Sequence, residues 1–175
     1  MSALRPALFL DRDGVINADK GYVCHRHDFD WMAGAADCIS HFNRLGWYVF
    51  IVTNQSGIAR GLYTEADMQA LHDWMCAELA HKQARIDQIY YCPYHAEGDI
   101  ERYRRDSFDR KPKPGMILQA MADYPVQRET SLLIGDKLTD MQAGEAAGVK
   151  TYLFEGGNLA QFAKWALADL QAGGR

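Results

Sequence analysis

The sequence predicts an α/β fold, a Rossmann-like three-layer sandwich with a central parallel sheet of at least five strands. Short apolar runs of strand length alternate along the chain with segments of helical periodicity, the order of a parallel sheet covered on both faces. The strand-like runs are apolar at nearly every position, as in strands buried on both sides. With 175 residues and no linker-like stretch, we expect a single domain, residues 1–175.

The first half of the chain supplies two strands and one helix. The apolar run Ala7–Leu10 is the first strand and ends at Asp11. A helix is expected over residues 37–45, where apolar side chains recur at helical spacing and Gly46 follows as a stop. Residues 48–53 are mostly β-branched or aromatic, so they form the second strand, and a polar turn comes after it.

The middle of the chain contains a second helix, a third strand and a long loop. The helix begins at Thr64, because Thr-Glu-Ala-Asp is typical of a helix start, and apolar residues keep helical spacing to Leu79. Residues 88–92 form the third strand. Residues 93–114 are rich in charge and proline and show no sustained period, which predicts a loop.

The last third of the chain repeats the alternation. In order, we expect a helix around residues 116–121, a strand over 131–134, a helix over 139–147, a strand over 151–154 and a closing helix over 159–170.

Composition excludes several classes of function. The net charge of −4 and the pI near 5.8 argue against a binder of nucleic acid, which needs clustered basic residues. No apolar run reaches the roughly 18 residues of a membrane span, and no apolar leader precedes the first strand, so we expect a cytoplasmic protein without a membrane partner. The four scattered cysteines are expected to be reduced. We expect a monomer.

Polar side chains gather where the predicted strands end. They are Asp11 and Asp13 after the first strand, Thr53 and Asn54 after the second, and Asp136 and Asp140 after the fourth, while Arg110-Lys111-Pro112 opens a helical segment. An isolated Asp-x-Asp-Gly could be an ordinary solvated turn. Because the carboxyl ends of parallel strands share one edge of the sheet, all of these groups should instead meet in one crevice.

The types of residue at this edge suit phosphoryl transfer. One carboxylate can attack phosphorus, and a second can protonate the leaving oxygen and later activate water. Mg²⁺ prefers oxygen ligands, which Asp11, Asp13 and Asp136 could supply. Thr53, Asn54 and Lys111 could hold the phosphoryl oxygens.

Four segments resemble the motifs of haloacid-dehalogenase-like phosphatases. They are DRDGVIN at 11–17, TNQSGIARG at 53–61, RKPKPG at 110–115 and GDKLTDM at 135–141. The longer strings resemble one branch of that family, the D-glycero-D-manno-heptose 1,7-bisphosphate 7-phosphatases and their histidinol-phosphatase relatives. The resemblance implies a Mg²⁺-dependent phosphatase that removes the 7-phosphate through an aspartyl-phosphate, a step in the synthesis of lipopolysaccharide core precursors.

The resemblance also implies roles for individual residues. Asp11 becomes the nucleophile and Asp13 the general acid/base, with Asp136 as a magnesium ligand. Thr53 and Lys111 become phosphate holders. The residues expected to contact a phosphorylated sugar are Asp19, Lys20, Gly21, Tyr22, Gln55, Ser56, Arg60, Arg110 and Lys137. Among them, Arg60, Arg110 or Lys20 could bind a distal phosphate.

The sequence departs from this branch in its long loop. Members commonly hold a structural zinc there through a Cys-x-His pair and a later Cys-x-Cys pair. Here the corresponding stretches read Cys92-Pro93-Tyr94-His95 and Ser107-Phe108-Asp109, so only Cys92 stands in its place. Since structural zinc needs four such ligands, we expect none. A mixed site of His95 with Asp106 or Asp109 is the alternative. The segment Cys24 to His27 resembles a ligand cluster, but we expect no metal there.

Other interpretations remain open at this stage. The intervals after the first two strands have too little room for a large cap domain, so the site should be open. Histidinol phosphate is an alternative substrate. A phosphoryl-accepting receiver domain also clusters aspartates on a parallel sheet, but its accepting aspartate follows the third strand, which here ends in Tyr91-Cys92. A binding protein on a disabled phosphatase scaffold is the third alternative, although no expected catalytic residue is missing.

Overall fold

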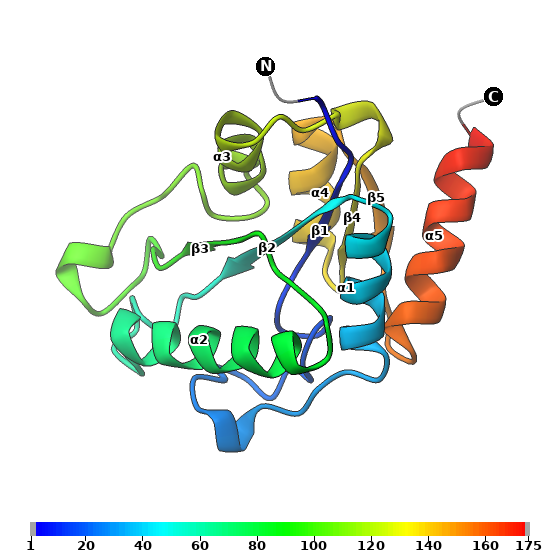
Figure 1. The fold of residues 1–175 in the computed structure, drawn as a ribbon. Coiled ribbons are helices and arrows are strands. Elements are labelled where there is room, and N and C mark those ends of the chain that lie inside the picture. The colour runs from blue at the N-terminus through cyan, green and yellow to red at the C-terminus, as the bar shows by residue number, and fades with distance from the viewer. Residues whose placement is uncertain (1–2, 174–175) are drawn as a thin grey trace.

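A computed structural model describes residues 3–173 and contains one five-stranded parallel sheet (Figure 1). The strands lie in the order β3-β2-β1-β4-β5. Their bounds are β1 Ala7–Leu10, β2 Tyr48–Asn54, β3 Gln88–Cys92, β4 Leu132–Gly135 and β5 Lys150–Leu153. The chain therefore starts in the centre of the sheet, adds two strands on one side and then two on the other.

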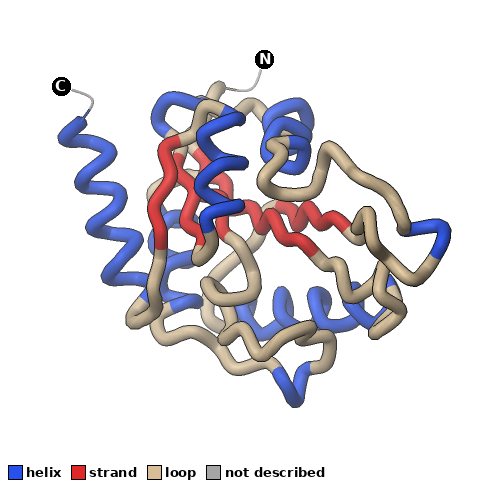
Figure 2. The backbone as a smooth tube through the Cα atoms, turned by 180° about the vertical axis from the view of Figure 1, so that it is seen from behind, coloured by secondary structure: helices blue, strands red, loops and turns tan. Residues whose placement is uncertain are grey.

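Five α-helices within residues 3–173 cover the two faces of the sheet (Figures 1 and 2). Helices α1 (Ala35–Arg44), α2 (Glu65–His81) and α5 (Leu159–Gly173) pack on one face, and α3 (Gly115–Asp123) and α4 (Leu138–Ala147) on the other. Short 3-10 turns lie at Arg26–Asp28, Glu101–Tyr103 and Arg128–Thr130. The predicted three-layer α/β fold without a large cap is confirmed.

Alternation along β1 divides the core between these layers. Leu8 and Leu10 belong to the apolar cluster under α1, α2 and α5, whereas Ala7 and Phe9 belong to the cluster under α3 and α4. All four side chains are fully buried because successive residues of a strand point to opposite faces. This packing fixes the direction in which β1 delivers Asp11 to the carboxyl edge of the sheet.

The start of α2 is the capping box that the sequence predicts. The Thr64 hydroxyl accepts a hydrogen bond from the backbone N–H of Asp67, and the Asp67 carboxylate accepts one from the backbone N–H of Thr64. The helix bounds agree with the predictions to within a few residues at each end, with one difference. Arg110 and Lys111 lie in a turn and do not open a helix, since α3 begins only at Gly115.

The segment from residue 93 to 114 projects from the β3 edge of the sheet (Figure 1). It is a loop apart from one 3-10 turn, as predicted. Its apolar side chains pack into a satellite cluster with residues that follow β2, among them Ile58, Tyr63 and Met68. Within residues 3–173, none of the helices combines the length and the apolar character that crossing a membrane would require.

Candidate active site

The predicted site residues meet at the carboxyl edge of the sheet around an open cleft of about 490 Å³. Asp11 directly follows β1, and its backbone N–H donates to the carbonyl of Ile134 in β4 (3.1 Å). The cleft is lined by Asp11, Asp13, Asp19, Gly21, Tyr22, Asn54, Gln55, Ser56, Tyr63, Arg110, Lys111, Lys137, Thr139 and Asp140. Most of the predicted contact residues therefore share one surface.

Lys111 lies at the base of this cleft and is fully engaged there. Its ammonium group is 3.0 Å from Oδ1 of Asp11 and 2.5 Å from Oδ1 of Asp140, and it donates to the carbonyl of Val52 at 2.8 Å. Burial alone would lower the pKa of Lys111, but the carboxylates of Asp11 and Asp140 more than offset it, so the pKa is raised. Lys111 is thus a buried cation that orients the Asp11 carboxylate.

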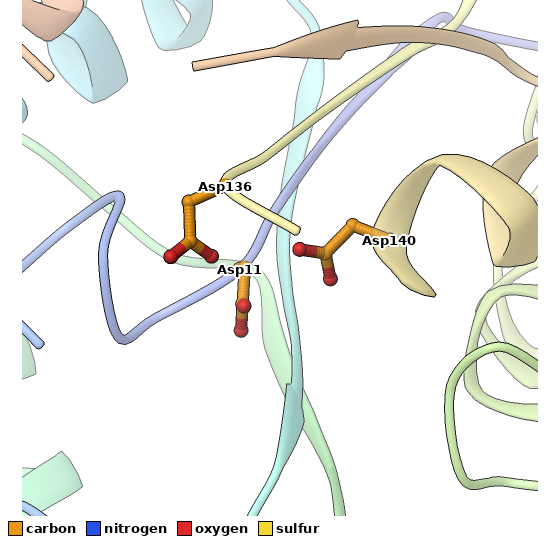
Figure 3. A group of neighbouring side chains, drawn as sticks. All are labelled: Asp11, Asp136 and Asp140. Carbon is orange, nitrogen blue, oxygen red and sulfur yellow. The ribbon is translucent and has the colours of Figure 1, made fainter. Parts of the chain in front are cut away.

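Three carboxylates converge beside Lys111 (Figure 3). Asp11, Asp136 and Asp140 each offer an oxygen, and these oxygens lie within 4.8 Å of one another. We expected Asp13 as the third acid of a magnesium site, which stays a prediction; Asp140 at the start of α4 is a further carboxylate in this group that we did not assign to the metal. Oδ1 of Asp136 is buried and has no hydrogen-bond partner among residues 3–173, and hard oxygen donors are the ligands that Mg²⁺ prefers. The residues present therefore fit a divalent cation.

The environment of Asp11 disfavours the ionised form of its carboxyl group. Burial, together with the nearby carboxylates of Asp140 and Asp13, raises its pKa to about 7, although Lys111 acts in the opposite direction. The pKa of Asp136 is raised as well, mainly by burial. A cation among these groups would reverse the effect, because it favours the ionised carboxylates.

Asp13 lies next to this cluster and accepts hydrogen bonds on both oxygens. Oδ1 accepts from Arg12 Nη2 (3.1 Å) and Asn17 Nδ2 (3.0 Å), and Oδ2 accepts from Gln55 Nε2 (3.1 Å). The three donors hold the carboxylate in one orientation at the wall of the cleft. That is the position in which a second acid can exchange a proton with a group bound near Asp11.

Two residues that support the site, Arg12 and His72, were not predicted from the sequence. Arg12 is completely buried, and its Nη1 lies 3.0 Å from Nε2 of His72 in α2. His72, which lies in the helix predicted from Thr64, is itself buried and lies against Arg12. Burial and the Arg12 charge lower the pKa of His72 to about 3, so the neutral ring accepts this hydrogen bond.

Asn54 was expected to hold phosphate, but its side chain has other partners. Oδ1 accepts from the backbone N–H of Lys111 (3.0 Å), and Nδ2 donates to the Lys111 carbonyl (3.1 Å). The end of β2 thereby fixes the turn that carries Lys111. Thr53 is buried beneath the cleft, where its hydroxyl accepts from Gln55 Nε2 at 2.9 Å.

The predicted contact residues divide into two groups. Asp19, Gly21, Tyr22, Ser56 and Lys137 line the cleft, and Asp19 pairs with Lys137 at 2.9 Å, which joins the loop after β1 to the start of α4. Lys20 points elsewhere, since its ammonium pairs with Asp30 at 2.6 Å and it is not among the lining residues. Arg60 also lies outside the lining.

Arg110 lines the cleft beside Lys111 and has unused donor capacity. Its Nη1 is buried and has no hydrogen-bond partner in the described part of the chain, and burial lowers the pKa of Arg110 from a very high ordinary value. Arg60 is close enough to act on Arg110 electrostatically, and its own Nη2 lies 3.4 Å from Nε2 of His95. Two guanidinium groups near one wall of an open cleft favour an anion there.

Polar and aromatic contacts hold the segment where relatives commonly bind zinc. Cys92 Sγ is 3.9 Å from the Tyr94 carbonyl, and His95 Nδ1 accepts from the backbone N–H of Glu97 at 3.1 Å. Glu65 accepts hydrogen bonds from the hydroxyls of Tyr91 (2.7 Å) and Tyr103 (2.5 Å). These contacts tie the segment to β3 and α2.

Comparison with known proteins agrees with this geometry. A protein-family model described as HAD-hydrolase-like matches residues 108–169. A relative from Rhodopseudomonas palustris, named D-glycero-beta-D-manno-heptose-1,7-bisphosphate 7-phosphatase, is 48% identical over 167 residues, which cover 95% of this chain and 93% of the relative. A relative from Burkholderia mallei, named as the phosphatase of the alpha anomer, is 49% identical and covers 84% of this chain and 78% of its own length.

A solved structure gives the same result in three dimensions. D,D-heptose 1,7-bisphosphate phosphatase from B. bronchiseptica, in complex with magnesium and phosphate, aligns with a TM-score of 0.81 at 30% identity, over 94% of this chain and 99% of that one. Fold and site together define a haloacid-dehalogenase-like hydrolase. Within that class, the chain belongs to the family of D-glycero-D-manno-heptose 1,7-bisphosphate 7-phosphatases.

Proposed function

We propose that this protein hydrolyses the 7-phosphate of D-glycero-D-manno-heptose 1,7-bisphosphate in a Mg²⁺-dependent reaction. The observation that carries the proposal is the pairing of Lys111 with Asp11 at the base of the cleft, with Arg110 beside it on the same turn. The ion pair with Lys111 suits Asp11 as a carboxylate nucleophile that attacks phosphorus. Arg110 suits a substrate with a second anionic group, and the names of the relatives specify a bisphosphate.

In this proposal Asp11 and Asp13 divide the chemistry. A carboxylate oxygen of Asp11 forms a bond to the phosphorus while the bond from phosphorus to the sugar oxygen breaks, and Asp13 donates a proton to that leaving oxygen. In the second step Asp13 takes a proton from water, whose oxygen displaces Asp11 from phosphorus and releases inorganic phosphate. The two oxygens of Asp13 are already oriented for this exchange by Arg12, Asn17 and Gln55.

The residues that would hold Mg²⁺ are Asp11, Asp136 and Asp140, with Asp13 beside them. A bound divalent cation would offset the negative charge of the carboxylates and of the phosphoryl group. Lys111 contributes further positive charge next to Asp11 and restrains that carboxylate through their ion pair. Thr53 is buried next to Gln55, whose Nε2 donates to its hydroxyl, and its contact with phosphate stays a prediction.

We infer that the distal 1-phosphate contacts Arg110. The unpartnered Nη1 of Arg110 is the donor that supports this, and a guanidinium can bind two phosphate oxygens at once. Arg60 adds positive potential from behind, although it does not line the cleft. A cytoplasmic location fits a soluble sugar phosphate as substrate.

We further infer that the segment of residues 93–110 folds without zinc. Support comes from the four positions where relatives have zinc ligands. Three of them, Tyr94, Ser107 and Asp109, are neither cysteine nor histidine. The nearby His95 already contacts Glu97 and Arg60. The hydrogen bonds of Glu65 with Tyr91 and Tyr103 supply the cross-links that a metal would otherwise supply.

The test is phosphate release from both anomers of the heptose bisphosphate and from histidinol phosphate, with Mg²⁺ present. We expect turnover of a heptose bisphosphate with a kcat/KM at least about tenfold above that for histidinol phosphate, and loss of turnover in Asp11→Asn. Preference for histidinol phosphate would change the substrate and leave the chemistry intact. Absence of turnover with every phosphomonoester would refute the proposal.

A further inference from the structure

Gln55 connects Asp13 to a buried tyrosine. Its amide nitrogen Nε2 donates to Oδ2 of Asp13 at 3.1 Å and lies 2.9 Å from the hydroxyl of Thr53, and its carbonyl oxygen Oε1 accepts from the hydroxyl of Tyr63 at 2.5 Å. Gln55 and Tyr63 are 2% and 7% exposed. The expected substrate contact Gln55 thus has all its polar atoms engaged inside the protein.

The orientation of the Gln55 amide decides whether Asp13 gains or loses a partner. Oδ2 of Asp13 is an acceptor in this contact, so the amide nitrogen of Gln55 must face Asp13 and the amide oxygen must face away. The reversed amide would place two acceptor oxygens against each other. Tyr63 selects the productive orientation, because its O–H donates to Oε1.

The hydroxyl of Tyr63 is held in this position by packing and stays a donor. The ring lies against Gly57, where a Cβ atom would be only 2.2 Å from a ring carbon, and it joins the satellite cluster of Ile58, Ala59 and Met68. Burial raises the pKa of Tyr63 above its ordinary value, so the phenol remains protonated at physiological pH.

Oδ2 of Asp13 depends on the hydrogen bond from Gln55, whereas Oδ1 does not. Oδ1 has two donors, Arg12 and Asn17, whereas Gln55 is the one donor recorded for Oδ2 within residues 3–173. Loss of the Gln55 contact would free the carboxylate to rotate about its last bond. A proton donor that is misplaced by a fraction of an ångström loses much of its catalytic effect.

We propose that Tyr63 is a positioning residue for Asp13 and acts through the amide of Gln55. The role rests on the proposed phosphatase function, in which Asp13 exchanges the proton with the leaving oxygen. Tyr63 itself lies at the edge of the cleft and touches no reacting atom in this scheme. This role explains why a glycine follows Gln55 by two positions, since Gly57 makes room for the Tyr63 ring that orients the Gln55 amide.

The test compares Tyr63→Phe, Gln55→Ala and the double variant, using the phosphomonoester that the wild type hydrolyses fastest. Tyr63→Phe keeps the ring that fills the space beside Gly57 and removes only the hydroxyl. We expect its kcat to fall by about tenfold, part of the 10²–10⁴ that a general acid contributes, with KM changed less than about twofold. The pH profile of kcat should also differ from that of the wild type. The double variant should be no slower than Gln55→Ala, because both changes break the same chain of hydrogen bonds from Tyr63 through Gln55 to Asp13.

The matched control is Tyr152→Phe, which removes a hydroxyl that bonds a carboxylate, Asp169 at 2.9 Å, away from the cleft. It should leave kcat and the pH profile unchanged. A second variant, Gln55→Glu, retains the bond to Tyr63 and places an oxygen opposite Asp13, so it should lower kcat and shift the profile even if Tyr63→Phe folds poorly.

Two results would overturn the inference. One is a Tyr63→Phe or Gln55→Glu enzyme with the kcat and pH profile of the wild type. The other is an additive loss in the double variant, which would mean that Tyr63 acts independently of Gln55. Both leave an active wild type and therefore spare the proposed function. A wild type without phosphatase activity would remove the two together.

Discussion

Gly14 and Asp136 lie so close together that no side chain fits between them. A Cβ atom on Gly14 would lie 2.1 Å from Oδ2 of Asp136, and the backbone of Gly14 has a φ of +88°, which other residues rarely adopt. The turn after β1 therefore forms one wall around the carboxylate that follows β4. The shape of the acidic cluster depends on a residue that contributes no ligand side chain.

Gly14→Ala should weaken magnesium binding by about tenfold or more, because the new methyl group displaces Asp136, and disturbed ligand support commonly costs that much. The measurement is the Mg²⁺ concentration that gives half-maximal activity. Gly46→Ala is the matched control, since Gly46 has a φ of +78° but nothing within 4 Å of its Cβ position. Equal effects of the two changes would point to backbone strain alone.

Asp11→Asn should be more stable than the wild type in EDTA at pH 8. The folded protein holds Asp11 with a pKa of about 7 against an ordinary 3.8, so the wild type loses stability as the pH rises from about 4 to 7. At about 1.4 kcal/mol per unit of pKa, the difference approaches 4 kcal/mol above pH 7. Urea unfolding at pH 4 and pH 8 measures it, and an equal gain at both pH values would contradict the explanation.

Arg110→Ala should raise KM for the heptose bisphosphate by about tenfold or more and change KM for an aryl phosphate by less than about twofold. The reason is that only the bisphosphate carries a second anion for the unpartnered Nη1. Arg85→Ala serves as a control, because Arg85 pairs with Asp87 away from the cleft. Equal rises in KM for both substrates would place Arg110 at the transferred phosphate instead.

His72 should make stability depend on pH below neutrality. Its pKa is lowered to about 3 in the folded protein, from 6.5, so the unfolded chain binds the extra proton between these values and stability is lost as the pH falls. Between pH 7.5 and pH 5 the wild type should lose about 2 kcal/mol more than His72→Gln. Urea unfolding at the two pH values gives the comparison, and identical losses would argue against a neutral buried ring.

The fold and the activity of the protein should not depend on zinc. We expect metal analysis of the purified protein to find no stoichiometric zinc, and activity to return fully when Mg²⁺ alone is added after EDTA treatment. The hydrogen bonds that Glu65 accepts from Tyr91 and Tyr103 explain why the loop would persist. One tightly bound zinc per chain would show that His95 and the nearby acids form a mixed site after all.

Local patterns in the sequence predict most of the fold. The apolar run before Asp11, the capping box at Thr64 and the alternation of strands and helices all depend on neighbours in sequence, so the sequence alone predicts them. The meeting of Asp11 and Asp136 also followed, since each comes directly after a strand and parallel strands end at one edge of a sheet.

Contacts between side chains that are far apart in the sequence could not be predicted from the sequence. Nothing near His72 in the sequence points to Arg12, which lies 60 positions away and reaches it only once α2 packs on the sheet. Gln55 and Asn54 look like substrate contacts by type, yet their partners are Tyr63 and the backbone of Lys111. The place of Asp140 among the acids depends on how α4 begins, and sequence spacing does not give that.

The two hydrogen bonds of Asn54 to the backbone of Lys111 have a consequence for how this family can diversify. They anchor the turn on which Arg110 and Lys111 are neighbours, so residues 93–109 can vary in length and composition while the nucleophile keeps its geometry. New substrate preferences could thus arise by exchange of that loop, with the hydrolytic machinery inherited unchanged.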